Sequence, residues 1–277
     1  MEQMQHGASP SRRRRKRCAL LSVAIVLFVI AVLAIVLGLT LRQKTNTFKT
    51  TFIARCERFK GYDCENIWVA FEQAYVGQDA CNVPMEAYDH LVTNMGLFKP
   101  ACNRMMFWSK TKDVVHDFTK KRDCFLTLED TILGSVLDSL TWCGKEGSSD
   151  TFTTGCPEWN YCENNPVRSF WKSASSAFAD VACGNVTAML NGSIPTPFHP
   201  ASIFGSIEVK RLNSTRTRSL NVVLVTQKNM LTNCTNASLK ELEKALDEGI
   251  KYNCKEVTES QIQDCSSNED IPCGACW

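Results

Sequence analysis

Several motifs that mark common enzyme classes are missing from the 277-residue sequence. No G-x-G occurs, so the glycine fingerprint of a dinucleotide-binding domain is absent. HExxH and G-x-S-x-G are absent too, which removes the usual signatures of zinc proteases and α/β-hydrolases. Gly144-Lys145 lacks the upstream glycine of a P-loop, because position 139 is serine. No metal ion is expected, and any nucleotide chemistry must use another kind of site.

Histidine is scarce, and neither sign of charge dominates. Only His90, His116 and His199 follow residue 41, and we expect each of them at the surface or at its boundary. The chain has 31 basic and 29 acidic residues, a balance that argues against a dedicated nucleic-acid binder. A charged fraction of 22% and an apolar fraction of 44% also exclude a disordered chain.

One long apolar segment divides the chain. Residues 19–41 read ALLSVAIVLFVIAVLAIVLGLTL, which is long enough to cross a bilayer as one helix. Six basic residues at 12–17 precede it, so the positive-inside rule predicts a cytoplasmic N-terminus. A cleaved signal peptide is the alternative, but its apolar region is normally about 7–15 residues long. The basic run is also compatible with a nuclear signal, although its position favours a determinant of topology.

The segment predicts three parts: a cytoplasmic tail at 1–18, a transmembrane signal anchor at 19–41 and an extracellular domain at 42–277. This is a single-pass type II protein of the plasma membrane. The extracellular part has a net charge of −3, so the overall +2 does not indicate a polyanionic partner. Five N-x-Ser/Thr sequons lie in it and are candidate glycosylation sites: Asn185, Asn191, Asn213, Asn233 and Asn236.

Fourteen of the 15 cysteines follow the apolar segment. An even number of cysteines in an extracellular domain predicts a disulfide framework. Cys273-Gly-Ala-Cys276 is a CxxC sequence, and here we expect disulfides to other partners instead of redox or zinc chemistry. Cys18 lies at the cytoplasmic boundary and is expected to be unpaired.

The pattern of apolar residues predicts an α/β (α+β) fold stabilised by disulfides, with a mainly helical lobe at about 50–190 and a smaller lobe with a short, mostly parallel sheet at about 191–277. Helical spacing or capping signals predict helices at 64–77, around 114–118, from Thr127 to about 140, at 166–182 and at 239–250. Strands are predicted at 203–212 and 221–226.

A few aromatic and acidic residues stand out as site candidates, each with a plain structural alternative. Trp108 and Trp171 could simply belong to the core. Glu129 and Asp138 flank an apolar helix, where acidic residues are common near the N-terminus. Glu208 interrupts the predicted strand at 203–212 and could lie on a solvated face. Residue by residue, the structural explanations are the more frequent ones.

Five segments taken together resemble the ADP-ribosyl cyclase/cyclic ADP-ribose hydrolase family. They are CNRMMFWSK around Trp108, TLEDTILG at 127–134, LTWCG at 140–144, NNPVRSFW at 164–171 and FGSIEV at 204–209. The resemblance covers residues 52–273 in order, and the basic tail and single span are similar to the lymphocyte-surface type of that family. It implies an NAD glycohydrolase and cyclase that makes ADP-ribose and cyclic ADP-ribose, hydrolyses the latter and feeds calcium signalling.

The resemblance also assigns roles to particular residues. Glu208 would be the catalytic carboxylate that stabilises or traps the ribosyl cation, and Cys102 and Cys183 are assigned with it to the catalytic set. The substrate-binding residues would be Trp108, Trp171, Glu129, Asp138, Ser109, Lys110, Lys112, Ser175 and Phe204. NAD, NADP and cyclic ADP-ribose would be substrates, and no cofactor is needed because NAD is consumed.

Within this set, individual roles differ. The tryptophans would enclose the substrate, one of them offering a π face to the cationic pyridinium. Glu129 is linked to the balance of cyclisation against hydrolysis, and Lys112 to cyclic ADP-ribose. Three positions depart from the family: Lys110 replaces an arginine, Ile203 a threonine and Ser139 an acid.

By the same resemblance, twelve cysteines pair as 56–64, 81–162, 102–183, 143–156, 234–254 and 265–273. Cys124 and Cys276 have no counterpart, and they could pair with each other, bridge chains or stay free. A second interpretation of the whole chain is a cell-surface receptor on the same fold with weak catalysis, and it can coexist with the first. A homodimer and a protein ligand on another cell remain open.

Overall fold

The computed structural model describes residues 25, 27–33, 36, 47–96, 100–226 and 231–277. The chain divides into two compact units, residues 1–48 and 49–277. In the first, residues 27–33 are helical. Most of the predicted span at 19–41 lies outside the described residues, and among those that are described no helix combines the length and apolar character of a membrane crossing.

Two long helices of the second unit begin after residues whose side chains cap them. In α2 (Cys64–Gln73), the Asp63 carboxylate accepts the backbone N–H of Asn66, and the helix buries Ile67, Trp68 and Phe71. In α6 (Pro166–Asp180), the Asn165 side chain accepts from the N–H of Arg168, and proline occupies the first turn. Both predicted helices are confirmed. The remaining short elements of this part are residues 49–56, η1 (Met85–Tyr88) and α3 (Asp89–Met95).

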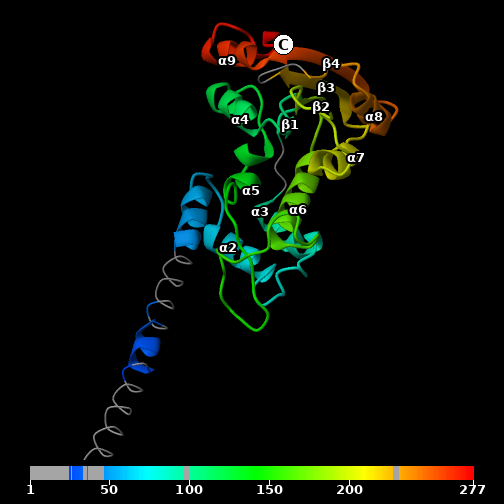
Figure 1. The fold of residues 1–277 in the computed structure, drawn as a ribbon. Helices are drawn as coiled ribbons and strands as arrows, with labels where there is room; N and C mark the ends of the chain where they lie inside the picture. The colour runs from blue at the N-terminus through cyan, green and yellow to red at the C-terminus, as the bar shows by residue number, and fades with distance from the viewer. Residues whose placement is uncertain (1–24, 26, 34–35, 37–46, 97–99, 227–230) are drawn as a thin grey trace, which may run out of the picture. The chain divides into compact units, whose positions relative to one another are not determined.

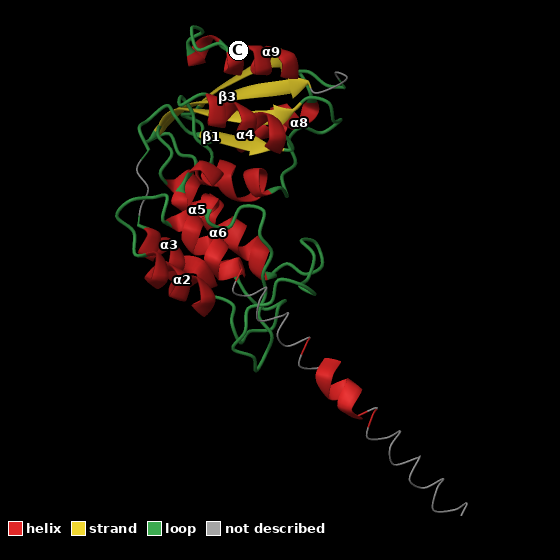
Figure 2. Cartoon of the chain, turned by 90° about the vertical axis from the view of Figure 1, so that its left-hand side faces the viewer, coloured by secondary structure: helices red, strands yellow, loops and turns green. Residues whose placement is uncertain are grey.

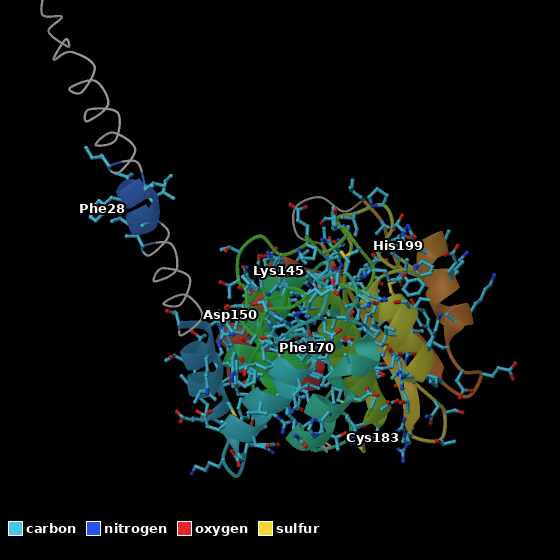
Figure 3. The ribbon with its side chains drawn as sticks, turned by 90° about the horizontal axis from the view of Figure 1, so that it is seen from below. Phe28, Lys145, Asp150, Phe170, Cys183 and His199 are labelled. Carbon is cyan, nitrogen blue, oxygen red and sulfur yellow. A yellow bond between two sulfur atoms is a disulfide. The ribbon has the colours of Figure 1, made fainter. Side chains whose placement is uncertain are left out.

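Aromatic side chains hold these helices together. Trp142 is completely buried and donates its indole N–H to the Tyr88 hydroxyl at 2.9 Å. Its ring packs edge-on against Phe170 of α6 and against Phe71 of α2, with centroids 5.6 and 5.2 Å apart. Phe170 lies among the packed side chains of the helical part (Figure 3).

The described residues also form a four-stranded sheet in the order β1-β2-β3-β4, and every pairing in it is parallel. The strands are β1 (Met106–Ser109), β2 (Gly184–Asn191), β3 (Thr217–Thr226) and β4 (Lys251–Thr258). In Figures 1 and 2 they gather at one end of this unit, while α2, α3 and α5 lie at the other. The predicted fold class and strand 221–226 are confirmed, although β1 and β2 come from the region expected to be mainly helical.

One face of the sheet is covered by α4 (Lys112–Lys121) and α9 (Glu259–Ser267). Val114, Val115 and Phe118 of α4 pack with Met189 of β2 and Val223 of β3. This stripe confirms the helix predicted around 114–118. It also fixes the two-residue loop between β1 and α4, which contains the candidate site residue Lys110.

The strand predicted at 203–212 is wrong, because the segment is helical. A π-helix, η3 (Phe204–Glu208), runs into α7 (Val209–Arg211). Ser202 starts the turn: its hydroxyl accepts the N–H of Gly205, and its carbonyl accepts the N–H of Ser206. These local bonds override the strand preference of the isoleucines and valine. A π-turn of this kind often accompanies functional sites.

Two other predicted helices are shorter than expected. The capping box of Thr127 and Asp130 is present, but it caps only the 3-10 turn η2 (Leu128–Asp130). Thr131 then adopts an extended conformation and caps a second helix, α5 (Ile132–Ser135). Similarly, α8 (Ala237–Ala245) ends before residue 250, since Leu246 is extended.

Seven disulfides join the described cysteines, and five pairs agree with the resemblance: 56–64, 81–162, 102–183, 143–156 and 234–254. The implied pair 265–273 is wrong. Cys273 pairs with Cys124, and Cys265 pairs with Cys276. Cys273 begins the short helix η4 (Cys273–Ala275), and Cys276 follows it directly. Buried Arg122 explains the difference, because it donates to the carbonyls of residues 265, 268 and 271 and fixes the C-terminal segment over α4.

Candidate active site

A cavity of about 510 Å³ lies at the carboxyl end of β1, the end of a parallel sheet where ligands usually bind. Its lining also comes from α6, from the η2–α5 region and from the π-helix η3. It brings together ten of the predicted site residues, far apart in sequence: Trp108, Ser109, Lys110, Lys112, Glu129, Asp138, Trp171, Ser175, Phe204 and Glu208. The segments chosen from the sequence therefore form one site.

Glu208 is the most buried carboxylate of this cavity, with 7% of the residue exposed. Burial raises the pKa of Glu208 to about 8; a hydrogen bond from Ser175 of α6 opposes this shift and the charge of Glu129 adds to it. The backbone of η3 approaches the preceding loop closely, since a Cβ on Gly205 would lie 2.6 Å from the His199 carbonyl oxygen. Glycine at 205 thus lets the turn that carries Glu208 pack into place.

Glu129 and Trp108 form a bonded pair on one wall. The Trp108 indole N–H donates to Glu129 Oε2 at 3.2 Å. His116, from α4, completes the group: its Nε2 lies 4.0 Å from the same oxygen, and its ring meets the Trp108 ring edge-on at 5.5 Å. The side chains of His116 and Glu129 are only 12% and 11% exposed. His116, Trp108 and Glu129 thus pack together on this wall of the cavity.

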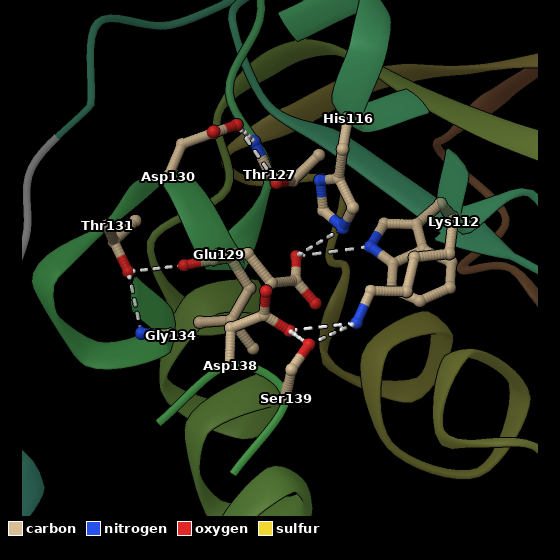
Figure 4. Close-up of polar contacts among 11 residues, drawn as sticks. Lys112, His116, Thr127, Glu129, Asp130, Thr131, Gly134, Asp138 and Ser139 are labelled. Atoms are coloured by element: carbon tan, nitrogen blue, oxygen red, sulfur yellow. Dashed lines mark hydrogen bonds and ion pairs between the residues drawn. The ribbon is translucent and has the colours of Figure 1, made fainter. Parts of the chain in front are cut away.

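Asp138 and Lys112 form a second charged pair nearby. Lys112 Nζ lies 2.9 Å from Asp138 Oδ1 and also donates to the Ser139 hydroxyl. Burial alone would raise the pKa of Asp138, but the hydrogen bond and charge of Lys112 bring it below its usual range. Figure 4 shows the carboxylates of Glu129 and Asp138 side by side, with His116 and Lys112 reaching them from α4.

Two cavity residues have unusual backbone conformations. Lys110 (φ 61°) and Ser139 (φ 60°) lie in the left-handed region, which is uncommon for residues other than glycine. The Lys110 turn is held by its neighbours, because Asn191 Nδ2 donates to the Lys110 carbonyl and the Thr111 hydroxyl donates to the Met189 carbonyl. Such strain persists when the surroundings fix it, and it concentrates at functional sites.

The sequence interpretation missed several members of this site. His116 was expected at the surface or at its boundary, and it is half-buried as a boundary residue, but its place beside Glu129, one turn after Lys112 on α4, was not predicted. Trp159 also lines the cavity, from the loop between Cys156 and Cys162. The sequence held a usable signal for Trp159. A short loop between two cysteines has little core in which to bury an indole, so a tryptophan there is a candidate for contact with a ligand.

The predicted catalytic role of Cys102 and Cys183 is not supported by their position. The two are joined as a disulfide, so neither offers a thiolate, and neither lines the cavity. Their bond ties the segment before β1 to the start of β2. Among the candidate glycosylation sites, Asn185 and Asn233 are exposed, Asn213 and Asn236 are half-buried and Asn191 is buried. Glycosylation at all five stays a prediction.

Comparison with known proteins identifies a family for the chain. A protein-family model described as ADP-ribosyl cyclase matches residues 45–274. ADP-ribosyl cyclase/cyclic ADP-ribose hydrolase 1 of Mus musculus is 38% identical over 210 residues, covering 72% of this chain and 69% of the relative. The Aplysia californica ADP-ribosyl cyclase/cyclic ADP-ribose hydrolase is 31% identical over 214 residues, covering 72% of this chain and 76% of the relative.

Solved structures agree with the sequence relatives. Porcine CD38 complexed with a covalent intermediate, ribo-F-ribose-5'-phosphate, matches with a TM-score of 0.71 and 35% identity, over 76% of this chain and 96% of that one. The Aplysia cyclase complexed with substrate NGD and product cGDPR matches with a TM-score of 0.71 and 28% identity, over 81% of this chain and 94% of that one.

Proposed function

The chain belongs to the ADP-ribosyl cyclase family, and from that premise we propose that Glu208 acts in cleavage of the nicotinamide N-glycosidic bond of NAD while Trp108 and Trp171 hold the substrate in the cavity. The chain is an ADP-ribosyl cyclase/cyclic ADP-ribose hydrolase, an enzyme that acts on NAD. The observation that carries the residue assignment is the buried carboxylate of Glu208 in a cavity also lined by Trp108 and Trp171.

The leaving group determines what the site must supply. The nicotinamide of NAD is a cationic pyridinium, so the electron pair of the broken C1′–N bond neutralises it, and no general acid is needed. The ribose carbon becomes oxocarbenium-like, and an ionised Glu208 would stabilise it or bond to it covalently. The covalent intermediate described for porcine CD38 supports the second route. Trp108 or Trp171 would hold the pyridinium through a cation–π contact.

The raised pKa of Glu208 fits this role when the substrate charge is considered. In the free enzyme, burial raises the pKa of Glu208 and favours the neutral acid at pH values below about 8. Binding a pyridinium places a positive charge beside the carboxyl group, which favours ionisation. Departure of neutral nicotinamide would remove that charge just as positive charge develops on the ribose. Glu208 would therefore be ionised while it is needed.

The intermediate can react in two ways. Water that adds at C1′ loses a proton and gives ADP-ribose, whereas the adenine N1 of the same molecule gives cyclic ADP-ribose. Glu129 would influence this choice, since its carboxylate faces the cavity and can orient or deprotonate a water molecule. Addition of water to bound cyclic ADP-ribose completes the hydrolase reaction.

The substrate phosphates would lie near the turn after β1. Ser109, Lys110 and Lys112 line this side of the cavity, and Ser175 and Phe204 line it from α6 and η3. Lysine provides a point charge for a diphosphate, and the exposed Lys110 has room to follow the extra phosphate of NADP. NADP and cyclic ADP-ribose are therefore proposed as further substrates.

Substitution of Glu208 tests the assignment. Glu208→Gln should abolish nicotinamide release from NAD while the protein remains folded, as judged by circular dichroism and by secretion or surface expression. Lys210→Gln is a matched control, because Lys210 is exposed on α7 two residues away and should retain full turnover. Full turnover by Glu208→Gln would show that another carboxylate carries the reaction.

The cell-biological setting is part of the proposal. The apolar run at 19–41 and the basic residues before it support a type II anchor in the plasma membrane, with the enzyme outside the cell and its products feeding calcium signalling. The seven disulfides are those of a protein from an oxidising compartment. Antibody labelling of intact cells against a tag at each end of the chain would test the orientation. A homodimer and a protein ligand on another cell stay predictions.

A further inference from the structure

A second cavity of about 490 Å³ lies on the sheet, away from the active site. Thr187 of β2 and Asn221 of β3 pair in register and line it, each two residues before Met189 and Val223 of the core under α4 and α9. Side chains two residues apart share a face of a strand. One face of the sheet is thus apolar beneath the helices and polar at the amino ends of its strands.

The polar part is an ordered chain of hydrogen bonds that ends on Asn185. Asn253 Nδ2 donates to Asn221 Oδ1 at 2.9 Å, and Asn221 Nδ2 donates to the Ser219 hydroxyl at 3.3 Å. The Ser219 hydroxyl then donates to Asn185 Oδ1 at 3.0 Å. Because Oδ1 of Asn185 is held as an acceptor, its amide is oriented, and no described residue accepts a hydrogen bond from its Nδ2.

Asn185 is also a sequon, Asn185-Val186-Thr187, and its side chain is exposed. The Nδ2 atom that the network leaves available is the atom to which an N-linked glycan is attached. Thr187 is only 3% exposed in the folded protein, so attachment would precede the pairing of β2. The sugar would then meet the cavity as the sheet forms.

An aromatic pair also lines the cavity. It consists of Phe125 and Trp277, whose ring centroids are 5.4 Å apart at an angle of 34°. Both are anchored covalently by their neighbours, since Cys124 bonds to Cys273 and Cys276 bonds to Cys265. These are the two disulfides that depart from the expected pattern. Aromatic faces beside amide groups suit a saccharide, whose C–H face packs on a ring while its hydroxyl and acetamido groups take hydrogen bonds.

We propose that Asn185 carries an N-linked glycan whose first N-acetylglucosamine lies in this cavity, between the asparagine network and Trp277. In the attachment step, Asn185 Nδ2 bonds to C1 of an oligosaccharide carried on a lipid diphosphate. The C1–O bond breaks, the lipid diphosphate leaves with the electron pair, and Nδ2 releases one proton. The inference rests on the proposed extracellular placement of residues 42–277, and it gives the C-terminal disulfides a function: they hold Trp277 against the sugar.

Glycopeptide mass spectrometry on the full chain from mammalian cells is the first test. We expect Asn185 to be occupied. If Asn213 or Asn233 is occupied and Asn185 is not, the glycan inference fails while the extracellular placement stands. If none of the five sequons is occupied, the placement fails as well, so the two failures are distinguishable.

Thermal unfolding is the second test, on detergent-solubilised full chain trimmed enzymatically to a single N-acetylglucosamine at each site. Removing the Asn185 sugar by Asn185→Gln should lower Tm by about 2–4 °C, the shift that accompanies a modest loss of stability in a domain of this size. Thr187→Val removes the sequon but retains the hydrogen bond from Ser219 to Asn185, so it isolates the effect of the sugar and should also lower Tm. In a Trp277→Leu background both shifts should fall to less than half.

The control is Asn213→Gln, which removes a sugar from a sequon outside this cavity and should give a Tm change that does not depend on Trp277. Deglycosylation of the unmutated protein by an amidase provides a measurement that needs no variant, and it too should lower Tm. Shifts at Asn185 that are the same with Trp277 intact and in the Trp277→Leu background would place the sugar outside the cavity and overturn the proposal.

Discussion

The indole N–H of Trp108 donates to the carboxylate of Glu129 at 3.2 Å, although the two residues come from β1 and from the η2 turn. The bond links one of the two rings proposed to hold the substrate to the acid proposed to decide between cyclisation and hydrolysis. A change at either residue therefore moves the other. The charge of Glu129 also raises the pKa of Glu208, so a change at Glu129 affects both Trp108 and Glu208.

The pH dependence of NAD cleavage should reveal Glu208. Its pKa is raised to about 8 by burial in the free enzyme, and the reaction needs the ionised form. We expect kcat/KM to rise about tenfold per pH unit below 8 and to level off above it, because kcat/KM reports the free enzyme. The rising part of the pH profile of kcat should lie at lower pH, since the bound pyridinium favours ionisation of Glu208. Identical limbs in kcat and kcat/KM would contradict the proposed effect of the substrate charge.

Neutralising Glu129 should shift this profile. Glu129→Gln removes a negative charge that raises the pKa of Glu208, so the limb in kcat/KM should move below 8. The ratio of cyclic ADP-ribose to ADP-ribose should also rise several-fold, because a carboxylate that can activate water is lost. Chromatography of the products of NAD gives the ratio. Asp117→Asn is the control: Asp117 is exposed on α4 directly after His116, and its change should alter neither the pH profile nor the product ratio.

Glu208 should also affect stability in a pH-dependent way. Its folded pKa lies above the unfolded value of 4.5, so the folded state binds more protons between these values and is destabilised as pH rises through about 8. Glu208→Gln removes this effect, and its Tm should exceed that of the wild type by more at pH 8 than at pH 5. A difference of ~1 kcal/mol corresponds to about 2–4 °C. A constant difference across this range would mean that Glu208 is already ionised in the folded protein.

The sequence located the site better than it located the secondary structure around it. Glu208 was identified by resemblance while its segment was predicted to be a strand, because the Ser202 bonds that start the helical turn are not visible as a periodicity. β3 was evident from its β-branched run, but β1 has four residues, and β4 has only one buried residue to reveal it. Their pairing depends on tertiary contacts that no local pattern encodes.

His116 shows a different limit. A single histidine on a helix is compatible with a surface position, and the sequence gives no sign that Glu129 lies within 4.0 Å. The contact exists because α4 and the η2 turn both pack beside β1. The cysteine pairs illustrate the same point: five followed the resemblance, while the partners of Cys265 and Cys273 depend on how Arg122 positions the end of the chain.

The pairing of the two C-terminal disulfides can be tested chemically. Peptide mapping under non-reducing conditions should recover Cys124 linked to Cys273 and Cys265 linked to Cys276. Recovery of a 265–273 peptide together with a 124–276 peptide would contradict the structure. The double variant Cys124→Ser/Cys273→Ser should unfold at lower temperature, since the bond closes a segment with a sequence separation of 149, and such cross-links are worth about 2–4 kcal/mol. NAD cleavage below the transition should be retained, because neither cysteine lines the active-site cavity. The matched control is the loss of Cys56–Cys64, with a separation of 8, which should cost less on the same entropic argument.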